Sequence, residues 1–169
     1  IFWSEAAVQS RRYLAKACHP VTGMCAEYAE FDGTPMQRKL GWSNDRHDWF
    51  YSDSYRTAAN IGLDYEWFGI DEGQCAAVDR LQEFLLEDAR RNQFHTYEIN
   101  GTVAQSDVLH PVAIIATVAQ GSLAANNPFT NEWIERFWNT PMRTGVRRYY
   151  DNCLYFFAFL ALSGNYRIW

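Results

Sequence analysis

The stretch from Pro111 to Ala119 constrains the fold more than any other part of this sequence. From Val112 onward every side chain in it except that of Thr117 is apolar, whichever side of a helix it occupies. Proline suits the first position of a helix, because the N–H group that it lacks would have no partner there. A helix that is apolar all round is buried. The fold therefore has to enclose this helix.

Five further segments carry helical patterns. In residues 71–91, Val78 and Leu85 fall on one face and charged side chains on the other, which is typical of a helix on the outside of a fold. The other four span residues 4–17, about 53–68, 131–138 and about 146–163. Residues 95–103 alternate around Asn100-Gly101, which predicts a two-stranded β-hairpin. We expect an all-α chain of about six helices and one small β-hairpin, with apolar inner helices alternating with two-faced outer ones.

Composition narrows the class of protein. A length of 169 residues suits one domain, and a hydrophobic fraction of 48% indicates a globular chain. The net charge is −5 and no run of lysine or arginine occurs, so we expect no nucleic-acid partner and no membrane partner. No apolar run reaches the roughly 18 residues that cross a bilayer.

The cysteines and the first residues bear on location and completeness. The four cysteines are Cys18, Cys25, Cys75 and Cys153, without a C-x-x-C pair or a histidine at metal-ligand spacing. We expect buried, reduced thiols, no metal site and a cytoplasmic location. The chain opens on Ile1, without a methionine or a signal-like segment. We therefore expect that a preceding segment is missing.

A second unusual stretch, residues 45–56, holds three acids, two arginines, a histidine and four aromatic side chains. It leads into the helix that ends near residue 68. If this helix is capped at Asp53 or Ser54, a polar stripe of four side chains shares one helical face. The stripe consists of Asp53, Arg56, Asn60 and Asp64. Such a stripe is either the solvated side of a surface helix or the wall of a polar cleft.

Asp53 has the surroundings of a general base. At a helix start its carboxylate meets unpaired N–H groups and the positive end of the helix dipole, and Arg56 follows one turn later. All three effects favour the ionised form, which a general base needs when it takes a proton from water. The alternative is an ordinary N-cap. If Asp53 is not the base, Asp45 and Asp48 are the next candidates.

The connection over residues 21–41 is long and carries several turn signals, so it is either functional or lies along the surface. Its acids include Glu27, Glu30 and Asp32. We expect these side chains to be solvated, as acids in loops usually are. An acid catalyst among them is the alternative.

Four separated segments together resemble glycoside hydrolase family 8 and, within it, the reducing-end xylose-releasing exo-oligoxylanases. They are Glu27-Tyr28 to Asp32-Gly33-Thr34-Pro35, Phe50 to Ile61, Leu109-His110-Pro111, and Tyr149-Tyr150-Asp151 to Ser163-Gly164-Asn165-Tyr166-Arg167. The resemblance spans essentially the whole chain. It implies an (α/α)6 toroid, inverting hydrolysis of β-1,4-linked xylo-oligosaccharides, and no metal or organic cofactor.

The resemblance also implies roles for individual residues. The catalytic base of the family is an aspartate in an Asp-x-x-Arg context, which corresponds here to Asp53 with Arg56 beside it. Leu109, His110 and Pro111 match a kink that closes the cleft of the exo-acting members. We expect His110 to recognise the terminal xylose.

Aromatic side chains near residues 45–56 are candidates for stacking on sugar rings. They are Trp42, Trp49, Tyr51, Tyr55, Tyr149 and Tyr150. For each of them, packing in the core is the alternative.

Part of the family pattern does not occur in this sequence. The general acid of the family is a glutamate in a Ser-Glu-Gly-type motif, whereas Ser4-Glu5 is followed here by Ala6. The tyrosine that helps to position the attacking water has no counterpart either. Residues 1–169 are therefore expected to be the C-terminal part of one catalytic domain, with about six of its twelve helices. The absent N-terminal half would be the partner of this chain, which we expect to be inactive alone.

Three alternatives stay open. Within the family, the nearest is an endo-acting xylanase, a cellulase or a chitosanase. The second is a sugar-binding fragment without catalysis. The third is an all-α protein-interaction toroid, which predicts Asp53, Arg56 and Asn60 exposed on a convex surface.

Overall fold

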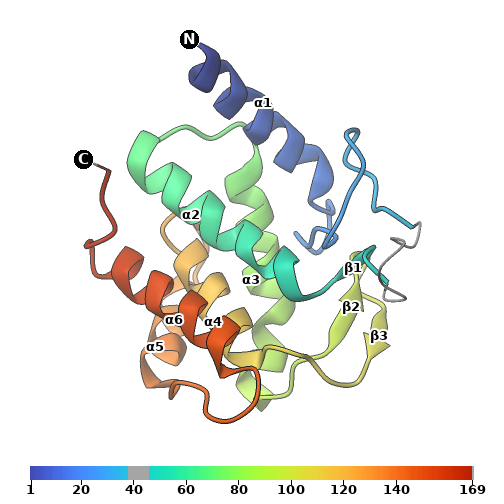
Figure 1. Cartoon of the computed structure of the whole chain (residues 1–169), viewed down its shortest axis with the longest axis vertical. Helices are drawn as coiled ribbons and strands as arrows, with labels where there is room; N and C mark the ends of the chain where they lie inside the picture. The colour runs from blue at the N-terminus through green and yellow to red at the C-terminus, as the bar shows by residue number, and fades with distance from the viewer. Residues whose placement is uncertain (38–45, 169) are drawn as a thin grey trace.

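The computed structural model describes residues 1–37 and 46–168, and it is mainly helical (Figure 1). The helices in this part of the chain are α1 (Phe2–Ala17), α2 (Arg56–Phe68), α3 (Gln74–Arg91), α4 (Pro111–Gly121), α5 (Thr130–Asn139) and α6 (Arg148–Leu162). Each corresponds to one of the segments that the sequence predicts. Their ends differ from the expected ones by a few residues.

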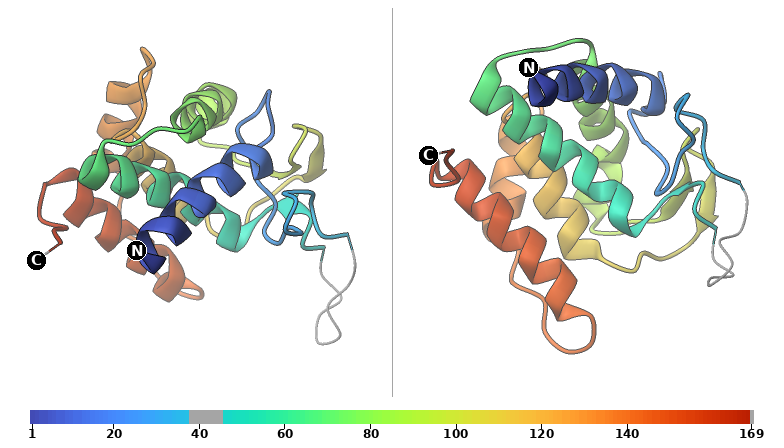
Figure 2. Two further views of the ribbon diagram at one scale, coloured as in Figure 1. Left: turned by 90° about the horizontal axis from the view of Figure 1, so that it is seen from above. Right: turned by 45° about the horizontal axis from the view of Figure 1, so that its top comes forward.

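Helix α4 is the enclosed helix. It lies between α2 and α6 (Figure 2), and α3 and α5 also pack against it. Every residue of α4 from Ala113 to Gly121 is buried, so all faces of this part of the helix are covered. The prediction that the fold encloses this helix is confirmed. Helix α1 lies outside, where it packs on α3.

Glycine allows α2 and α4 to come close together. A Cβ atom on Gly62 of α2 would lie 2.4 Å from the carbonyl oxygen of Gln120 in α4, which is far inside van der Waals contact. The Gln120 side chain donates a hydrogen bond to the Ala59 carbonyl oxygen at 3.1 Å. This close approach fixes the first half of α2 relative to the end of α4.

The sheet has one more strand than the expected hairpin. Strands β2 (Thr96–Glu98) and β3 (Val103–Gln105) flank the predicted Asn100-Gly101 turn. Strand β1 (Trp49–Phe50) pairs antiparallel with β2, so the order is β1-β2-β3. A two-residue strand is too short to show alternation in the sequence. The added strand attaches the stretch before α2 to the rest of the fold.

The chain enters α2 through a 3₁₀ turn, η1 (Ser52–Tyr55), so the predicted cap of α2 at Asp53 or Ser54 is wrong. The Ser54 hydroxyl accepts a hydrogen bond from the Tyr51 N–H at 2.8 Å and thereby stabilises the start of η1. The start of η1 is therefore stabilised by Ser54 and not by Asp53, and the Asp53 carboxylate is available for other partners.

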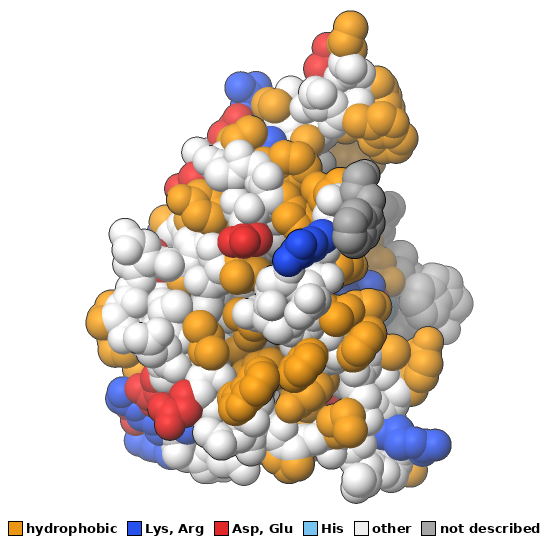
Figure 3. All heavy atoms as spheres, turned by 90° about the vertical axis from the view of Figure 1, so that its left-hand side faces the viewer, with side chains coloured by type: hydrophobic (Ala, Val, Ile, Leu, Met, Phe, Trp, Pro, Cys, Tyr) orange, Lys and Arg blue, Asp and Glu red, His pale blue; other side chains and the backbone are white. Residues whose placement is uncertain are grey.

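Several large apolar side chains remain at the surface. On α6 they are Tyr149, Phe156, Phe157 and Phe159, and at the ends of α1 and α2 they are Phe2, Trp3 and Phe68. Figure 3 shows apolar side chains gathered on the side of the molecule that lies to the left in Figure 1. In the described ranges, no helix combines the length and apolarity that crossing a membrane requires.

Candidate active site

The Asp53 carboxylate is held from two elements and remains open to water. Its Oδ2 atom lies 3.0 Å from Nη2 of Arg56, one turn later in the chain. Its Oδ1 atom accepts a hydrogen bond of 3.1 Å from the hydroxyl of Tyr150 on α6. The Asp53 side chain is 40% exposed. A carboxylate that is oriented by two donors and still reaches solvent can accept a proton from water.

Tyr150 is half-buried between Asp53 and the start of α4. Burial, and then the negative charge of Asp53, raise the pKa of Tyr150, so its hydroxyl remains a donor. The same oxygen lies 3.1 Å from the Ser52 carbonyl oxygen. The ring of Tyr150 packs against His110 with 4.4 Å between the ring centroids. Tyr150 thus joins two residues that the resemblance assigns to one site.

Glu27 belongs to the same group of residues, and the expectation that its side chain is solvated is wrong. The side chain is 8% exposed, and Oε2 lies 2.6 Å from Nδ1 of His47. Its Oε1 atom accepts from the Asp53 N–H at 3.5 Å. The loop folds back along β1, since the N–H of Glu27 donates to the Trp49 carbonyl oxygen at 2.9 Å. The signal in the sequence was that Glu27 belongs to one of the four resembling segments.

The Leu109-His110-Pro111 kink is anchored by buried charge. His110 is 6% exposed, and its Nδ1 atom lies 2.9 Å from the Asp151 carboxylate. Arg143 Nη1 donates to the Leu109 carbonyl oxygen at 2.7 Å. Pro111 begins α4, and His110 makes no side-chain hydrogen bond to the helix start. Asp151 belongs to one of the four resembling segments, although no role was predicted for it, and the sequence did not single out Arg143.

The aromatic candidates for sugar stacking lie in different environments. Tyr55 is 1% exposed and packs edge-on against Phe50, so it is part of the core. Tyr149 is 83% exposed, whereas Tyr51 and Trp49 are half-buried. The guanidinium carbon of Arg46 lies 5.1 Å from the centre of the Trp49 ring. Trp42 is outside the described residues.

The two other candidate bases differ from Asp53. Asp45 is outside the described residues. Asp48 is 8% exposed and receives two hydrogen bonds from Arg46, at 2.7 and 2.6 Å. The hydrogen bonds from Arg46 lower the pKa of Asp48. Because Asp48 is buried and already paired with Arg46, it is less accessible to a substrate water than Asp53.

The side chains of the predicted polar stripe do not all belong to one site. Asp64, at its far end, forms a two-point ion pair with Arg11 of α1, at 2.6 and 2.8 Å. This pair joins α1 to α2. Asn60 is exposed. Only Asp53 and Arg56 therefore belong to the candidate site.

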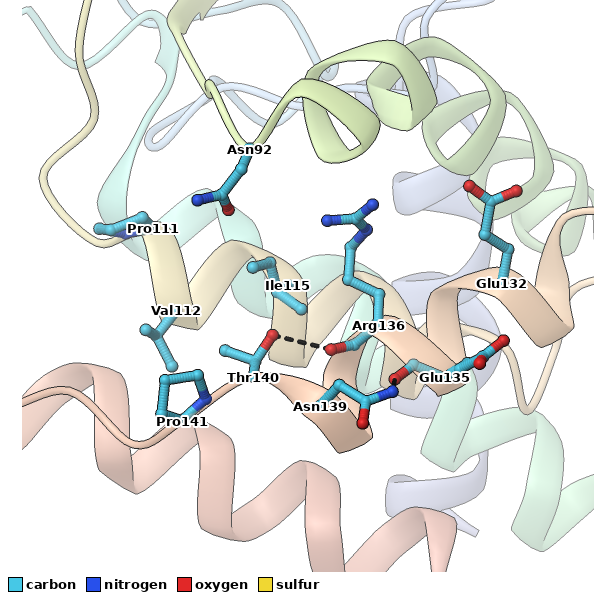
Figure 4. Close-up of a pocket in the computed structure, with 10 residues that line it drawn as sticks. All are labelled: Asn92, Pro111, Val112, Ile115, Glu132, Glu135, Arg136, Asn139, Thr140 and Pro141. Carbon is cyan, nitrogen blue, oxygen red and sulfur yellow. Dashed lines mark hydrogen bonds between the residues drawn. The ribbon is translucent and has the colours of Figure 1, made fainter.

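A separate hollow of about 620 Å³ lies on another side of α4 (Figure 4). Its wall includes Pro111 and Ile115 of α4 and Arg136 of α5, but not Asp53 or Tyr150. Pro111 thus borders this hollow, while His110 is turned toward Asp151. Among residues 1–37 and 46–168, no cluster of His, Cys, Asp or Glu side chains is suited to hold a metal ion.

Comparison with known proteins gives relatives along the whole chain. It is 52% identical over 168 residues to the reducing-end xylose-releasing exo-oligoxylanase Rex8A of Paenibacillus barcinonensis, matching 99% of this chain and 43% of the relative. It is 53% identical over 173 residues to the corresponding enzyme of Bifidobacterium adolescentis, matching 98% of this chain and 44% of that enzyme. No protein-family model matches the chain.

Solved structures agree with the sequence relatives. Rex8A complexed with xylose superposes with a TM-score of 0.92 at 51% identity, covering 99% of this chain and 43% of that one. A Rex8A variant complexed with an arabinofuranosyl-xylotetraose gives the same TM-score and coverage.

This chain is a homologue of the reducing-end xylose-releasing exo-oligoxylanases.

The homology confirms the family resemblance and the prediction that these helices are part of a helical toroid. The chain spans less than half the length of these exo-oligoxylanases and matches their C-terminal part. The roles of Asp53, Arg56, His110 and the aromatic side chains stay predictions.

Proposed function

We propose that this chain is the base-bearing part of a glycoside hydrolase domain that releases xylose from the reducing end of xylo-oligosaccharides. The exo-oligoxylanase relatives support the substrate and the reaction. The observation that carries the proposal is the Asp53 carboxylate, which is oriented by Arg56 and Tyr150 and reaches solvent.

Asp53 is the general base in this proposal. Inverting hydrolysis uses one ionised carboxylate to activate water and one protonated carboxyl group to protonate the leaving oxygen, about 6.5–9.5 Å apart. Arg56 stabilises the charge of Asp53, and the Tyr150 hydroxyl keeps the carboxylate in one orientation. The general acid is a glutamate outside these 169 residues, so the chain alone is inactive.

Leu109, His110 and Pro111 close the cleft beyond the first reducing-end sugar. The buried anchoring of this segment by Asp151 and Arg143 supports a rigid barrier. If the barrier is shortened, the enzyme should also cleave internal bonds, and longer products should appear in the product ladder. An unchanged ladder would count against this role and favour an endo-acting relative.

The test is xylose release from xylotriose by the polypeptide that carries this chain together with its general acid. Replacing Asp53 by asparagine keeps the shape and removes the base, so the rate should fall by ~10²–10⁴-fold. Asp107→Asn is the matched control, because Asp107 is exposed and its side chain faces solvent. An Asp53→Asn enzyme that keeps most of its activity would disprove the assignment.

A sugar-binding fragment without catalysis is the second candidate, because the chain contains only the proposed base. Calorimetry with xylobiose on the isolated chain separates the two. Binding that persists in the Asp53→Asn variant, with no turnover by the complete polypeptide, would favour the binding function.

A further inference from the structure

Asp151 of α6 is 0% exposed, less than any other charged side chain in the described part of the protein. Its Oδ2 atom is 2.9 Å from Nδ1 of His110 and 2.6 Å from Nη1 of Arg143. Its Oδ1 atom accepts from the Ala113 N–H in the first turn of α4 at 2.8 Å. A buried carboxylate is tolerated only when it is paired and hydrogen-bonded, so these three donors act together.

Arg143 extends this arrangement to the main chain of the kink. The Nη1 group that contacts Asp151 also donates to the Leu109 carbonyl oxygen at 2.7 Å. The Arg143 side chain is 25% exposed. Asp151 and Arg143 therefore hold three successive parts of the chain, which are the Leu109 carbonyl group, the His110 ring and the start of α4.

We propose that Asp151 and Arg143 are positioning residues that fix the tautomer and the orientation of His110. The proposal rests on the proposed function, in which His110 contacts the terminal xylose. The ionised carboxylate of Asp151 can only accept hydrogen bonds. When the His110 ring is uncharged, its hydrogen is therefore on Nδ1 and its lone pair is on Nε2. Arg143 supplies the positive charge that balances Asp151. Nε2 is then an acceptor for a sugar hydroxyl group.

The same turn of α6 also orients the proposed base. Tyr150, which precedes Asp151 in the sequence, donates to Asp53, while Asp151 holds His110. The ring of Tyr150 packs on that of His110. A displacement of this turn therefore moves the base and the histidine together.

The tautomer is measured directly on this chain by correlating the ring nitrogens and carbon-bound protons of its histidines in NMR spectra. At a pH at which the rings are uncharged, His110 should show a protonated Nδ1 and an unprotonated Nε2. In Asp151→Asn this pattern should be lost, because an amide can donate as well as accept. The half-buried His95, whose Nδ1 atom lies 3.0 Å from the Ser106 carbonyl oxygen, serves as an internal reference, and Asp107→Asn is the matched control variant.

A hydrogen on Nε2 of His110 in the unmodified chain would overturn the proposal, as would an unchanged pattern in Asp151→Asn. If Asp151→Asn does not fold, Arg143→Lys provides the second test, since lysine keeps the charge but cannot reach both acceptors with one planar group. Because the Asp151 carboxylate is still present, His110 should keep its hydrogen on Nδ1 in this variant, and a mixed pattern would overturn the proposal that Asp151 fixes the tautomer.

Kinetics of the complete polypeptide separate this proposal from the proposed function. Arg143→Lys should raise KM for xylotriose about tenfold with little change in kcat, whereas Asp53→Asn should lower kcat. An unchanged KM in Arg143→Lys would overturn the positioning role while leaving the hydrolase assignment in place. An active Asp53→Asn enzyme would overturn the assignment of Asp53 as the general base, and the tautomer result would still decide the role of Asp151.

Discussion

The Tyr150 hydroxyl has one hydrogen and two acceptors, the Asp53 carboxylate and the Ser52 carbonyl oxygen. Removing it in Tyr150→Phe should lower the free energy of unfolding of this chain by about 1 kcal/mol. This is less than the roughly 1.5–3 kcal/mol for hydrogen bonds to charged groups, because Asp53 is partly solvated. Urea unfolding measures the change. Tyr149→Phe is the matched control, because Tyr149, the preceding residue, is 83% exposed. Equal effects of the two substitutions would contradict a specific role for Tyr150.

The raised pKa values of three tyrosines predict that the free energy of unfolding decreases at alkaline pH. Burial is the largest cause that raises the pKa values of Tyr55, Tyr97 and Tyr150 in the folded chain. Above about pH 10 the unfolded chain loses these protons while the folded chain keeps them. The folded state then binds more protons, so the free energy of unfolding falls as pH rises. Denaturant unfolding from pH 8 to 11 measures this, and a flat profile would contradict it.

At the same scale, sequence reasoning identified Asp53 and Arg56 as neighbours but not their surroundings. Spacing along one helix turn places Arg56 beside Asp53. Tyr150 reaches Asp53 from 97 positions away, and Glu27 reaches it from 26 positions away. Such contacts depend on how the helices and the loop pack, and no local pattern in the sequence encodes them.

At the scale of elements, the contact between α2 and α4 depends on a missing side chain. In Gly62→Ala, the added Cβ would lie 2.4 Å from a backbone oxygen of α4, so the helices have to separate. We expect a cost of about 3 kcal/mol from overpacking, reduced by ~1 kcal/mol because alanine favours the helix. Calorimetric unfolding measures the net loss. Asn60→Ala, at an exposed position of α2, should change stability little, and a similarly small effect of Gly62→Ala would contradict the close approach.

The helices were predictable and the short elements were not, for a physical reason. A helix of ten or more residues repeats its apolar face several times, and α4 signals burial by having no polar face. Strand β1 has two residues and η1 has four, which is too short for any repeat. Both are specified by partners elsewhere, because β1 pairs with β2 and η1 packs on α4.

At the scale of the whole molecule, the exposed apolar side chains of α6, α1 and α2 predict association (Figure 3). Phe156 is 56% exposed and Phe68 is 54% exposed. An apolar surface of this kind is typical of an interface. The isolated chain should associate with itself as its concentration rises, and sedimentation velocity measures this.

Substitution of one aromatic side chain tests whether this apolar surface causes the self-association. Loss of one buried phenylalanine costs ~1.5–3 kcal/mol, so Phe156→Ser should raise the dissociation constant by ~10–100-fold. Glu66→Gln, at an exposed polar position of α2, is the control. If the unmodified chain remains monomeric at high concentration, the exposed apolar side chains of α6, α1 and α2 do not form an interface between copies of the chain.

The adjacency of Tyr150 and Asp151 limits how descendants of this protein can diverge. Consecutive residues of a helix are separated by about 100° of rotation and 1.5 Å of rise. A shift of the α6 register by one residue would turn both side chains away from Asp53 and His110 at once. Mutation can therefore exchange the two side chains one at a time, but a change of register in α6 would break the Tyr150–Asp53 and Asp151–His110 contacts in the same step.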